Sequence, residues 1–469
     1  MKQFIISFIG VAILFSACIK DDGNYDYIIP EEPVVKLEKV YSAYVGETLL
    51  IEPQITFSNS GSLSLEWTII DGDEMTEHVY TGDKLDIRFG LKAKLYSARL
   101  TVTDQSNGMK YFYPFSIHGH TDFTEGTVIL TSVGDKAQLV FVKPDGTIQD
   151  NLYEVINGES LPAHPTRIVP IQHQNIIGKP YLGYWLMSAD TDNPGVEMNV
   201  DDMSKIRDFR ENFFTEPEGP LAAGPFIPRD DATMCGIING KFYVGAFSTY
   251  YLAPVYGFFG TYIPGNYQLS PVLAVGADGT FFWSYDALRK SLVCFIPPAG
   301  MFFDASSMPG PPPAFDPSNI GLDAIHLAAS NSSFFFFGKD ASNAVFELKF
   351  GTGGQMVISQ YKRAFAHPEI LKDDSKWAMI KGQEIFYISS GNKVYRYNPV
   401  NESLEKVAAS FSGTVSMVKV LDSNTLLVGE DGKLHFLDIS IGKNGEISRS
   451  ISGFAGQPAD VYVRENVEE

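Results

Sequence analysis

Three stretches in the second half of the chain share one pattern: FFFFGKDASNAVFEL at residues 334–348, EIFYISSGNKVYRYNP at 384–399 and TLLVGEDGKLHFLD at 425–438. In each stretch, a run of apolar, strand-forming residues leads through a polar turn into a second such run. This arrangement is typical of a β-hairpin. The second runs begin at Val345, Val394 and Leu434, so the units repeat after 49 residues (345 to 394) and 40 residues (394 to 434).

A repeat of this length predicts a β-propeller-like domain over residues 120–469, because propeller blades recur every roughly 40–50 residues. A four-stranded blade cannot bury both of its faces alone, whereas a ring of blades can. The length of the domain favours about seven blades. Residues 460–464 are expected to form the last strand and to close the ring with a segment near Thr127. A parallel β-helix or successive sandwiches is the alternative, because the repeats are degenerate and lack a Trp-Asp signature.

The pattern of short, strand-like runs in residues 31–119 predicts a separate domain. Leu63, Leu65, Trp67 and Ile69 alternate with polar residues, which places them on one face of a strand. About ninety residues of such strands favour a two-sheet, immunoglobulin-like sandwich. The fold class is therefore all-β.

A family resemblance strengthens this interpretation. The predicted strand Trp67-Thr68-Ile69 leads to the turn Asp71-Gly72-Asp73, and apolar and polar residues alternate again in the later strand at residues 96–104. These two motifs together resemble those of the polycystic-kidney-disease (PKD) domain. Ala98 replaces the usual branched residue, and Ile70 is an extra residue before Asp71. With its long C-terminal region, the chain is similar to PKD-like lipoproteins of the Bacteroidota. The resemblance implies a spacer or binding module that accompanies an outer-membrane nutrient-uptake system.

The N-terminus has the features of a lipoprotein signal. Lys2 precedes an apolar run over residues 4–15, which is too short for the roughly 20 residues that a spanning helix needs. The sequence LFSAC at residues 14–18 resembles a bacterial lipobox. We therefore expect residues 1–17 to be a signal peptide and Cys18 to carry a diacylglycerol, whose acyl chains would anchor the protein stably in a membrane.

Residues 18–30 follow as a lipidated tether. The stretch IKDDGNYDY at residues 19–27 is polar and acidic, although Lys20 dilutes its charge. It resembles the acidic export tag of surface-exposed lipoproteins of the Bacteroidota. The resemblance implies an outer-membrane, lipid-anchored protein that faces the cell exterior.

Composition excludes one class of partner. The formal net charge is −20, and the Lys and Arg residues are not clustered, so nucleic acid is not an expected ligand. Cys235 and Cys294 both lie in apolar, strand-like settings, and free buried thiols are favoured over a disulfide. No cofactor or metal is indicated, since His118 and His120 form the closest histidine pair and lack a third ligand.

The sequence contains no recognisable catalytic motif. A nucleophile elbow, a zinc-protease motif, a phosphate loop and a dinucleotide fingerprint are all absent. The pairs Asp230-Asp231 and Asp373-Asp374 could in principle serve a glycosidase, but only their separation in space would qualify them. We expect a protein without catalytic residues, with a propeller lyase or glycosidase as the alternative.

Aromatic residues provide the best candidates for ligand binding. The stretch YYLAPVYGFFGTY at residues 250–262 is too rich in Pro, Gly and Tyr for a simple pair of strands, and it predicts an elaborated loop. Tyrosine and tryptophan rings can stack on sugars at low entropic cost. The candidates are Trp185, Tyr250, Tyr251, Tyr256 and Trp283.

One surface helix is expected at residues 203–214, where apolar residues recur at helical spacing. The whole sequence predicts a noncatalytic, surface-exposed lipoprotein that captures a ligand for nutrient uptake. A glycan is the first expected ligand and a peptide or protein the second. A scaffold subunit that docks onto outer-membrane transporter components is a further alternative.

The lipobox makes a direct prediction. Cys18→Ala removes the thiol that accepts the lipid, so the variant should incorporate no labelled palmitate when it is expressed in a bacterium, whereas the unchanged protein should. Cys235→Ala is the matched control and should still be labelled. A Cys18→Ala protein that still carries the label would disprove lipidation at this residue.

Overall fold

The computed structural model describes residues 31–58, 62–72, 75–176, 178–310, 312–331 and 333–465. The predicted signal peptide, Cys18 and the tether to residue 30 lie outside the described residues. Contacts divide the chain into two compact units. The first contains the chain up to Tyr41 with Leu49–Ile87 and Ser97–Ser116, and the second contains Ser42–Thr48, Arg88–Tyr96 and the chain from Ile117 onward.

Nine short strands follow one another along the N-terminal part of the described chain. They are β1 (Val34–Lys36), β2 (Val40–Tyr44), β3 (Thr48–Ile51), β4 (Gln54–Thr56), β5 (Leu63–Asp71), β6 (Thr76–Thr81), β7 (Leu85–Arg88), β8 (Leu95–Asp104) and β9 (Lys110–His120). They form a five-stranded sheet in the order β2-β9-β8-β5-β6 and the two-stranded sheets β1-β4 and β3-β7.

The alternation seen in the sequence positions the core of the first unit. Leu65, Trp67 and Ile69 of β5 are all buried on one face. The Trp67 ring meets Phe115 edge-on with a centroid distance of 6.0 Å, and its indole N–H donates a 3.0 Å hydrogen bond to the Gly82 carbonyl. The Trp67 strand expected from the sequence is β5, an inner strand of the five-stranded sheet that pairs with β8 and β6.

The second unit contains seven sheets in its described residues, and six of them are made of strands that follow one another in sequence. The second sheet is formed by β13 (Pro165–Gln172), β14 (Tyr181–Ser188), β15 (Gly195–Met198) and β16 (Lys205–Asp208). The third is formed by β17 (Ala223–Pro228), β18 (Met234–Ile238) and β19 (Lys241–Val244). The fourth is formed by β20 (Leu269–Val275), β21 (Phe282–Asp286), β22 (Ser291–Ile296) and β23 (Met301–Asp304).

The fifth to seventh sheets continue this series. The fifth sheet is formed by β25 (Asp323–Ala329), β26 (Phe334–Lys339), β27 (Val345–Gly353) and β28 (Met356–Ala364) with the short β24 (Ser306–Ser307). The sixth is formed by β29 (Trp377–Ile380), β30 (Ile385–Ser390), β31 (Lys393–Asn398) and β32 (Ser403–Lys406). The seventh is formed by β33 (Met417–Val420), β34 (Thr425–Glu430), β35 (Lys433–Asp438) and β36 (Glu446–Ser452). The three hairpins that open the sequence analysis are β26-β27, β30-β31 and β34-β35.

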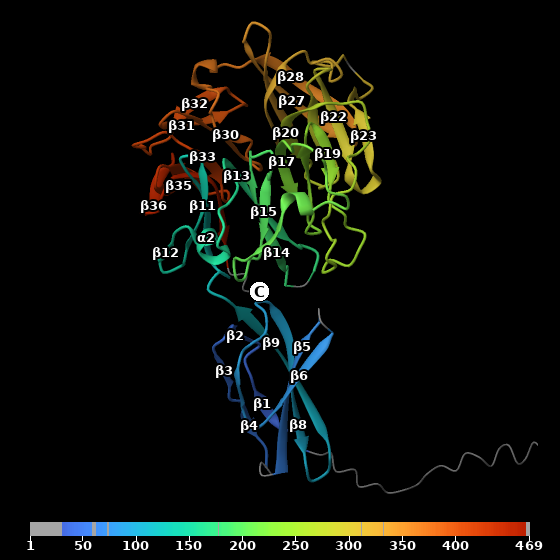
Figure 1. Cartoon of the computed structure of the whole chain (residues 1–469), viewed down its shortest axis with the longest axis vertical. Helices are drawn as coiled ribbons and strands as arrows, with labels where there is room; N and C mark the ends of the chain where they lie inside the picture. The colour runs from blue at the N-terminus through green and yellow to red at the C-terminus, as the bar shows by residue number, and fades with distance from the viewer. Residues whose placement is uncertain are drawn as a thin grey trace, which may run out of the picture. The chain divides into compact units, whose positions relative to one another are not determined.

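The first sheet joins the two ends of the unit. Its order is β12 (Ile148–Gln149), β11 (Lys136–Val142), β10 (Gly126–Val133) and β37 (Gln457–Arg464). Thr127 pairs with Val463 and Ile129 with Val461, so the last strand completes the sheet that the first strands began. This pairing is the ring closure expected from the sequence. In Figure 1 the sheets follow one another around the unit in colour order, and the red β35 and β36 return beside the teal β11.

Hydrophobic clusters between successive sheets hold the ring together. Seven such clusters occur in the described residues, and each is shared by two neighbouring sheets, the last of them by the seventh and the first. Alternate residues of a strand enter opposite clusters: Phe334 and Phe336 of β26 face the fourth sheet, while Phe335 and Phe337 face the sixth. The unbroken apolar runs follow from this burial on both faces. The unit is therefore a closed β-propeller.

Helices are few in the described residues. They are α2 (Leu152–Asn157) and three single-turn 3-10 helices, η2 (Phe209–Glu211), η3 (Pro297–Ala299) and η4 (Pro368–Ile370). None of the described helices has the length and apolar character that a bilayer-spanning helix requires.

The prediction of a helix at residues 203–214 is wrong. This segment contains strand β16 and the single turn η2 instead. Its apolar residues recur at helical spacing for another reason: Met203 packs into the cluster between the first and second sheets, whereas Phe209 and Phe213 pack into the cluster between the second and third. Residues that serve two opposite interfaces cannot lie on one face of a helix.

The closing strand can be tested by one substitution. Val461 is fully buried between the seventh and first sheets. Val461→Ala removes two buried methyl groups and should lower the free energy of unfolding by roughly 1–3 kcal/mol. Chemical denaturation measures the difference. Val400→Ala, at a site that is 78% exposed, is the control and should change little. Equal stability of the two variants would contradict closure through β37.

Candidate functional site

A long loop replaces the fourth strand of the third sheet. After β19, residues 245–268 (the aromatic loop) leave the sheet before β20 begins. The loop is tied down by backbone hydrogen bonds: Gly257 N–H donates to the Ala246 carbonyl at 2.8 Å and Phe259 N–H to the Asn212 carbonyl at 2.8 Å. A Cβ on Gly245 would lie 3.0 Å from the Gly257 carbonyl oxygen, so this close approach favours glycine. The loop therefore connects the third sheet to residues that follow the second.

A cavity of about 210 Å³ lies between these two sheets and the aromatic loop. It is walled by strands of the second sheet, by the start of β18 and by residues 251–257. The lining residues are Ile171, Leu182, Trp185, Glu197, Ile206, Arg207, Asn212, Ala232, Thr233, Met234, Tyr251, Leu252, Ala253, Pro254, Tyr256 and Gly257.

An ion pair forms the polar wall of the cavity. Glu197 of β15 and Arg207 of β16 are cross-strand partners, and Glu197 Oε2 lies 2.6 Å from Arg207 Nε. Burial raises the pKa of Glu197, and the Arg207 guanidinium offsets only part of that effect. Arg207 also lies 4.9 Å from the centroid of the Phe258 ring and donates from Nη1 to the Pro254 carbonyl at 3.3 Å. The ion pair thus attaches the aromatic loop to the second sheet.

The other polar groups of the cavity are bound within the protein. Asn212 Nδ2 donates to the Gly257 carbonyl at 3.1 Å, and Thr233 Oγ1 donates to Asp231 Oδ1 at 2.6 Å. The Tyr256 hydroxyl donates to the Asp231 carbonyl, and burial, with Asp231 nearby, raises the pKa of Tyr256 to about 12. This hydroxyl therefore stays protonated at neutral pH. The wall therefore offers hydrogen-bonding groups in fixed positions.

Three of the five predicted ligand-binding residues line this cavity. Trp185 is nearly fully buried in the cluster between the second and third sheets, and Tyr251 and Tyr256 are half-buried. Tyr250 is not a lining residue, but its ring meets that of Tyr251 at 5.0 Å and its surface is 55% exposed. The aromatic loop expected from the sequence therefore does border a cavity.

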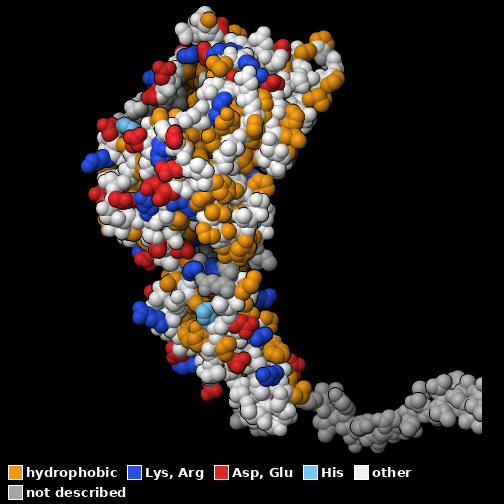
Figure 2. Space-filling model, turned by 45° about the vertical axis from the view of Figure 1, so that its right-hand side comes forward, with side chains coloured by type: hydrophobic (Ala, Val, Ile, Leu, Met, Phe, Trp, Pro, Cys, Tyr) orange, Lys and Arg blue, Asp and Glu red, His pale blue; other side chains and the backbone are white. Residues whose placement is uncertain are grey.

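Exposed aromatic and aliphatic side chains surround the cavity lining. Residues 242–277 contain no Asp, Glu, Lys, Arg or His, although 20% of the chain is charged. The large apolar residues that remain exposed here are Ile206, Phe214, Phe247, Tyr250, Leu252, Val255 and Tyr262. Figure 2 shows hydrophobic side chains gathered on one face of the second unit. We call this set of residues the apolar surface.

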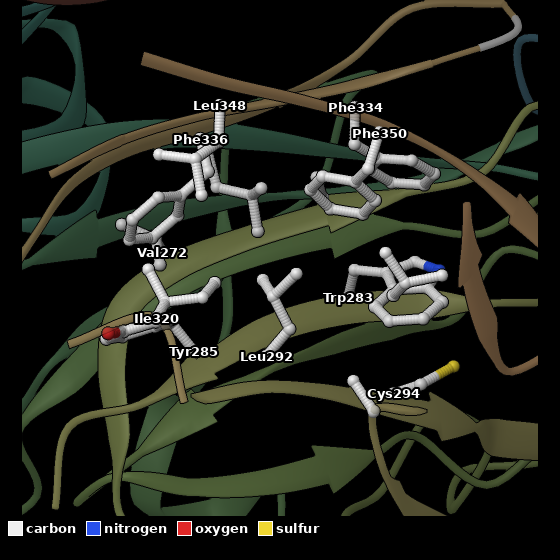
Figure 3. Close-up of a cluster of buried hydrophobic side chains, with 14 of the residues drawn as sticks. Val272, Trp283, Tyr285, Leu292, Cys294, Ile320, Phe334, Phe336, Leu348 and Phe350 are labelled. Carbon is white, nitrogen blue, oxygen red and sulfur yellow. The ribbon is translucent and has the colours of Figure 1, made fainter. Parts of the chain in front are cut away.

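Trp283 belongs to the core and not to this site. It is fully buried in the cluster between the fourth and fifth sheets, where its ring lies 5.9 Å from Phe334 and 5.8 Å from Phe350 (Figure 3). Residues of β21 enter clusters on both sides of the sheet, with Trp283 and Tyr285 towards the fifth sheet and Phe282 towards the third. A surface role for Trp283 is therefore corrected to a packing role.

Sequence reasoning missed the ion pair. The helix expected at residues 203–214 hid the cross-strand partnership of Arg207 with Glu197. One signal was present: Glu197 is a single acid inside the apolar strand Gly195–Met198. A buried carboxylate in such a strand requires a cation or a set of donors, so its partner could have been sought on the next strand.

The remaining candidates do not form a site. The rings of His118 and His120 lie 4.2 Å apart, and burial lowers the pKa of His120 to about 4. No group of three or more possible metal ligands occurs among the described residues. Asp231 pairs with Arg229 at 2.8 Å, and Asp373 and Asp374 are exposed in a loop.

Cys235 and Cys294 are free and buried, as expected. They lie in different clusters, and burial raises the pKa of each thiol to about 12. Both behave as small apolar residues.

The seventh sheet contains a buried carboxylate with a structural role. Glu430 accepts hydrogen bonds from Gly413 N–H at 2.7 Å, from His435 Nε2 at 3.1 Å and from Lys433 Nζ at 3.1 Å. Burial alone would raise the pKa of Glu430, but these hydrogen bonds and those of Ser412 outweigh it and lower the pKa to about 2. The carboxylate fixes the loop that leads into the sheet.

Comparisons with known proteins gave a family match and a structural match. A PKD-like family model matches residues 18–165. The match covers the N-terminal strands and extends into the first sheet of the propeller. No curated protein matches the chain. Among solved structures, the chain is similar to the β-propeller domain of Cps50 (Swd1) from Myceliophteria thermophila, with 10% identity, a TM-score of 0.38, and coverage of 68% of this chain and 97% of that one.

The low pKa of Glu430 predicts a specific acid dependence. A carboxylate whose pKa is lowered from 4.5 to about 2 stabilises the fold above pH 4.5, and this contribution is lost as the pH falls from 4.5 towards 2. Glu430→Gln should be less stable at pH 7 and should lose less stability across that window. Urea denaturation at several pH values measures both effects. The exposed Glu125→Gln is the control. Parallel pH profiles of Glu430→Gln and the unchanged protein would contradict the role of this carboxylate.

Proposed function

We propose that this chain is a noncatalytic glycan-binding module, exported and lipid-anchored at Cys18, that serves as an accessory component of an outer-membrane nutrient-uptake system. The observation that carries the proposal is the cavity beside the aromatic loop, where Trp185, Tyr251 and Tyr256 meet the Glu197–Arg207 pair. The anchoring and the uptake role rest on the lipobox, the acidic tether and the PKD-like resemblance.

The size of the cavity suits one sugar ring. Its volume of about 210 Å³ is below the roughly 300–1,000 Å³ of sites that enclose drug-sized ligands. A pyranose presents C–H groups on its faces and hydroxyls around its edge. Aromatic rings can contact the faces, while a carboxylate and a guanidinium hydrogen-bond to the hydroxyls.

The absence of a catalytic role is inferred from how the polar groups are used. Glu197 is paired with Arg207, and the Tyr256 hydroxyl is bound to a backbone carbonyl. A glycosidase needs two carboxyl groups that flank the scissile bond, and Glu197 is the one carboxylate among the described lining residues. The cavity is therefore better suited to holding a sugar than to hydrolysing its bond.

A second candidate function is that of a scaffold that docks onto a protein partner. The apolar surface favours it, because charged residues are depleted and aromatic residues enriched at the centres of protein interfaces. Residues 242–277 have this composition, and Phe214 is 56% exposed. Transporter components are the partners that the PKD-like resemblance implies.

Glycan binding is tested by calorimetric titration of the purified protein with a panel of oligosaccharides. Tyr251→Ala removes an aromatic wall of the cavity and should weaken binding by about tenfold or more, equivalent to about 1.4 kcal/mol. Tyr80→Ala, at a half-buried tyrosine of the first unit, is the matched control and should bind normally. Thermal denaturation of each variant checks that the fold is retained.

Two outcomes would reject parts of this proposal. Release of shorter products from any polysaccharide, measured by chromatography, would disprove the noncatalytic role. Failure to bind any glycan, together with co-purification of a transporter subunit, would establish the scaffold function in place of the glycan-binding one.

A further inference from the structure

We infer that the glycan bound in this cavity is neutral, and that the site discriminates against sugars that carry carboxylate or sulfate groups. This inference rests on the proposed function and names the ligand class of the same site. It follows from how charge is distributed in and around the cavity.

Charges inside the cavity compensate each other. Among the described lining residues, Glu197 is the one carboxylate and Arg207 the one cation, and their charged atoms lie 2.6 Å apart. Both side chains are largely buried, so solvent does little to screen them. An anionic sugar that took Arg207 as its partner would leave Glu197 buried without a counterion, which is strongly unfavourable.

Charges beside the cavity are also used within the protein. Arg229 pairs with Asp231 at 2.8 Å and lies 4.6 Å from the centroid of the Phe247 ring. Lys241 lies farther away, opposite Ile238 at the other end of β18 from Met234. It donates to the Tyr267 carbonyl and lies 5.6 Å from the centroid of the Tyr262 ring. These cations are therefore bound to protein groups and are not positioned for an acidic ligand.

The aromatic loop beside the cavity also lacks charged residues. Because residues 242–277 carry no charge, sugar units on either side of a bound ring would meet uncharged groups over the aromatic loop. An acidic polysaccharide would gain no electrostatic attraction there, and the net charge of −20 would repel it at long range.

A neutral sugar can bind without breaking the ion pair. A hydroxyl group both donates and accepts hydrogen bonds. It can donate to the Glu197 carboxylate and accept from the Arg207 guanidinium at once, so both charged groups keep their compensation. A carboxylate or sulfate can only accept, and therefore it satisfies Arg207 alone.

The test uses neutral and acidic oligosaccharides that share one backbone. Oligogalacturonides carry a carboxylate on every ring, and their carboxyl-reduced counterparts carry hydroxyls. The purified protein is titrated with both forms, and with neutral gluco-, manno- and xylo-oligosaccharides, at low and high salt. We expect at least about a tenfold preference for the neutral member of the matched pair, or binding of another neutral sugar with none for the acidic form.

Two variants shift the net charge of the cavity in opposite directions, because each removes one member of the ion pair. Glu197→Gln leaves Arg207 without a counterion, so the ratio of acidic to neutral binding should rise by about tenfold or more, and high salt should reduce the gain. Arg207→Gln leaves Glu197 uncompensated and should gain no acidic binding. Thermal denaturation confirms that each variant is folded, and Asp373→Asn, in an exposed loop, is a control for general charge effects.

Failure of the inference is distinct from failure of the proposed function. A wild-type preference for the acidic form would overturn the inference and leave glycan binding in place. A folded Glu197→Gln protein with an unchanged ratio would also overturn it, because the ion pair would then not control selectivity. The absence of binding to every glycan would overturn the proposed function and the inference with it.

Discussion

Every sheet of the propeller buries both faces, and this constraint determines most of the second unit. A sheet of four short strands has two apolar sides, and each is covered by the sheet that precedes or follows it. The seven clusters in the described residues are therefore shared, and no sheet has a core of its own. The stability of each sheet therefore depends on its two neighbours.

The same constraint explains which parts of the fold could be predicted from the sequence. A strand that is covered on both sides consists of consecutive apolar residues, which is why FFFF at residues 334–337 stands out as a strand. The closing strand was predictable because residues 460–464 contain branched and aromatic residues at the end of a chain whose repeats need a final partner. Pairing registers could not be predicted, because a run that is apolar throughout gives no indication of which residue faces which sheet.

The errors have the same physical origin. Met203, Phe209 and Phe213 recur at helical spacing, yet they enter clusters on opposite sides of the second sheet. Aromatic residues are common in binding sites, but Trp283 lies on a strand whose two faces are both covered, so its ring is fully buried in the core. The aromatic loop was recognised correctly, since its Pro and Gly residues exclude a regular strand. The ion pair beside it depends on which residues of β15 and β16 lie opposite each other, and this register cannot be predicted from composition.

The cavity exists because one sheet is incomplete. The third sheet has three strands in the described residues, and the chain then spends residues 245–268 outside the regular pattern before the fourth sheet begins. A fourth strand would have covered the edge of β19 with backbone hydrogen bonds alone. The loop instead places Tyr251 and Tyr256 in the cavity lining with Trp185, and its Phe258 ring packs on Arg207, the ion-pair partner of Glu197. The cavity and the ring therefore depend on different segments, because the loop lies outside the strands that form the ring.

The partnership of β10 with β37 also has a consequence for synthesis. These two strands are among the first and the last parts of the propeller to be made, and they lie in the same sheet. A nascent chain that still lacks its last few residues has every other strand and an open gap between the seventh and first sheets. Domains that are complete early in synthesis can fold before the chain is released, but this ring has to wait for its final strand. Until then, the apolar faces on both sides of the gap are uncovered.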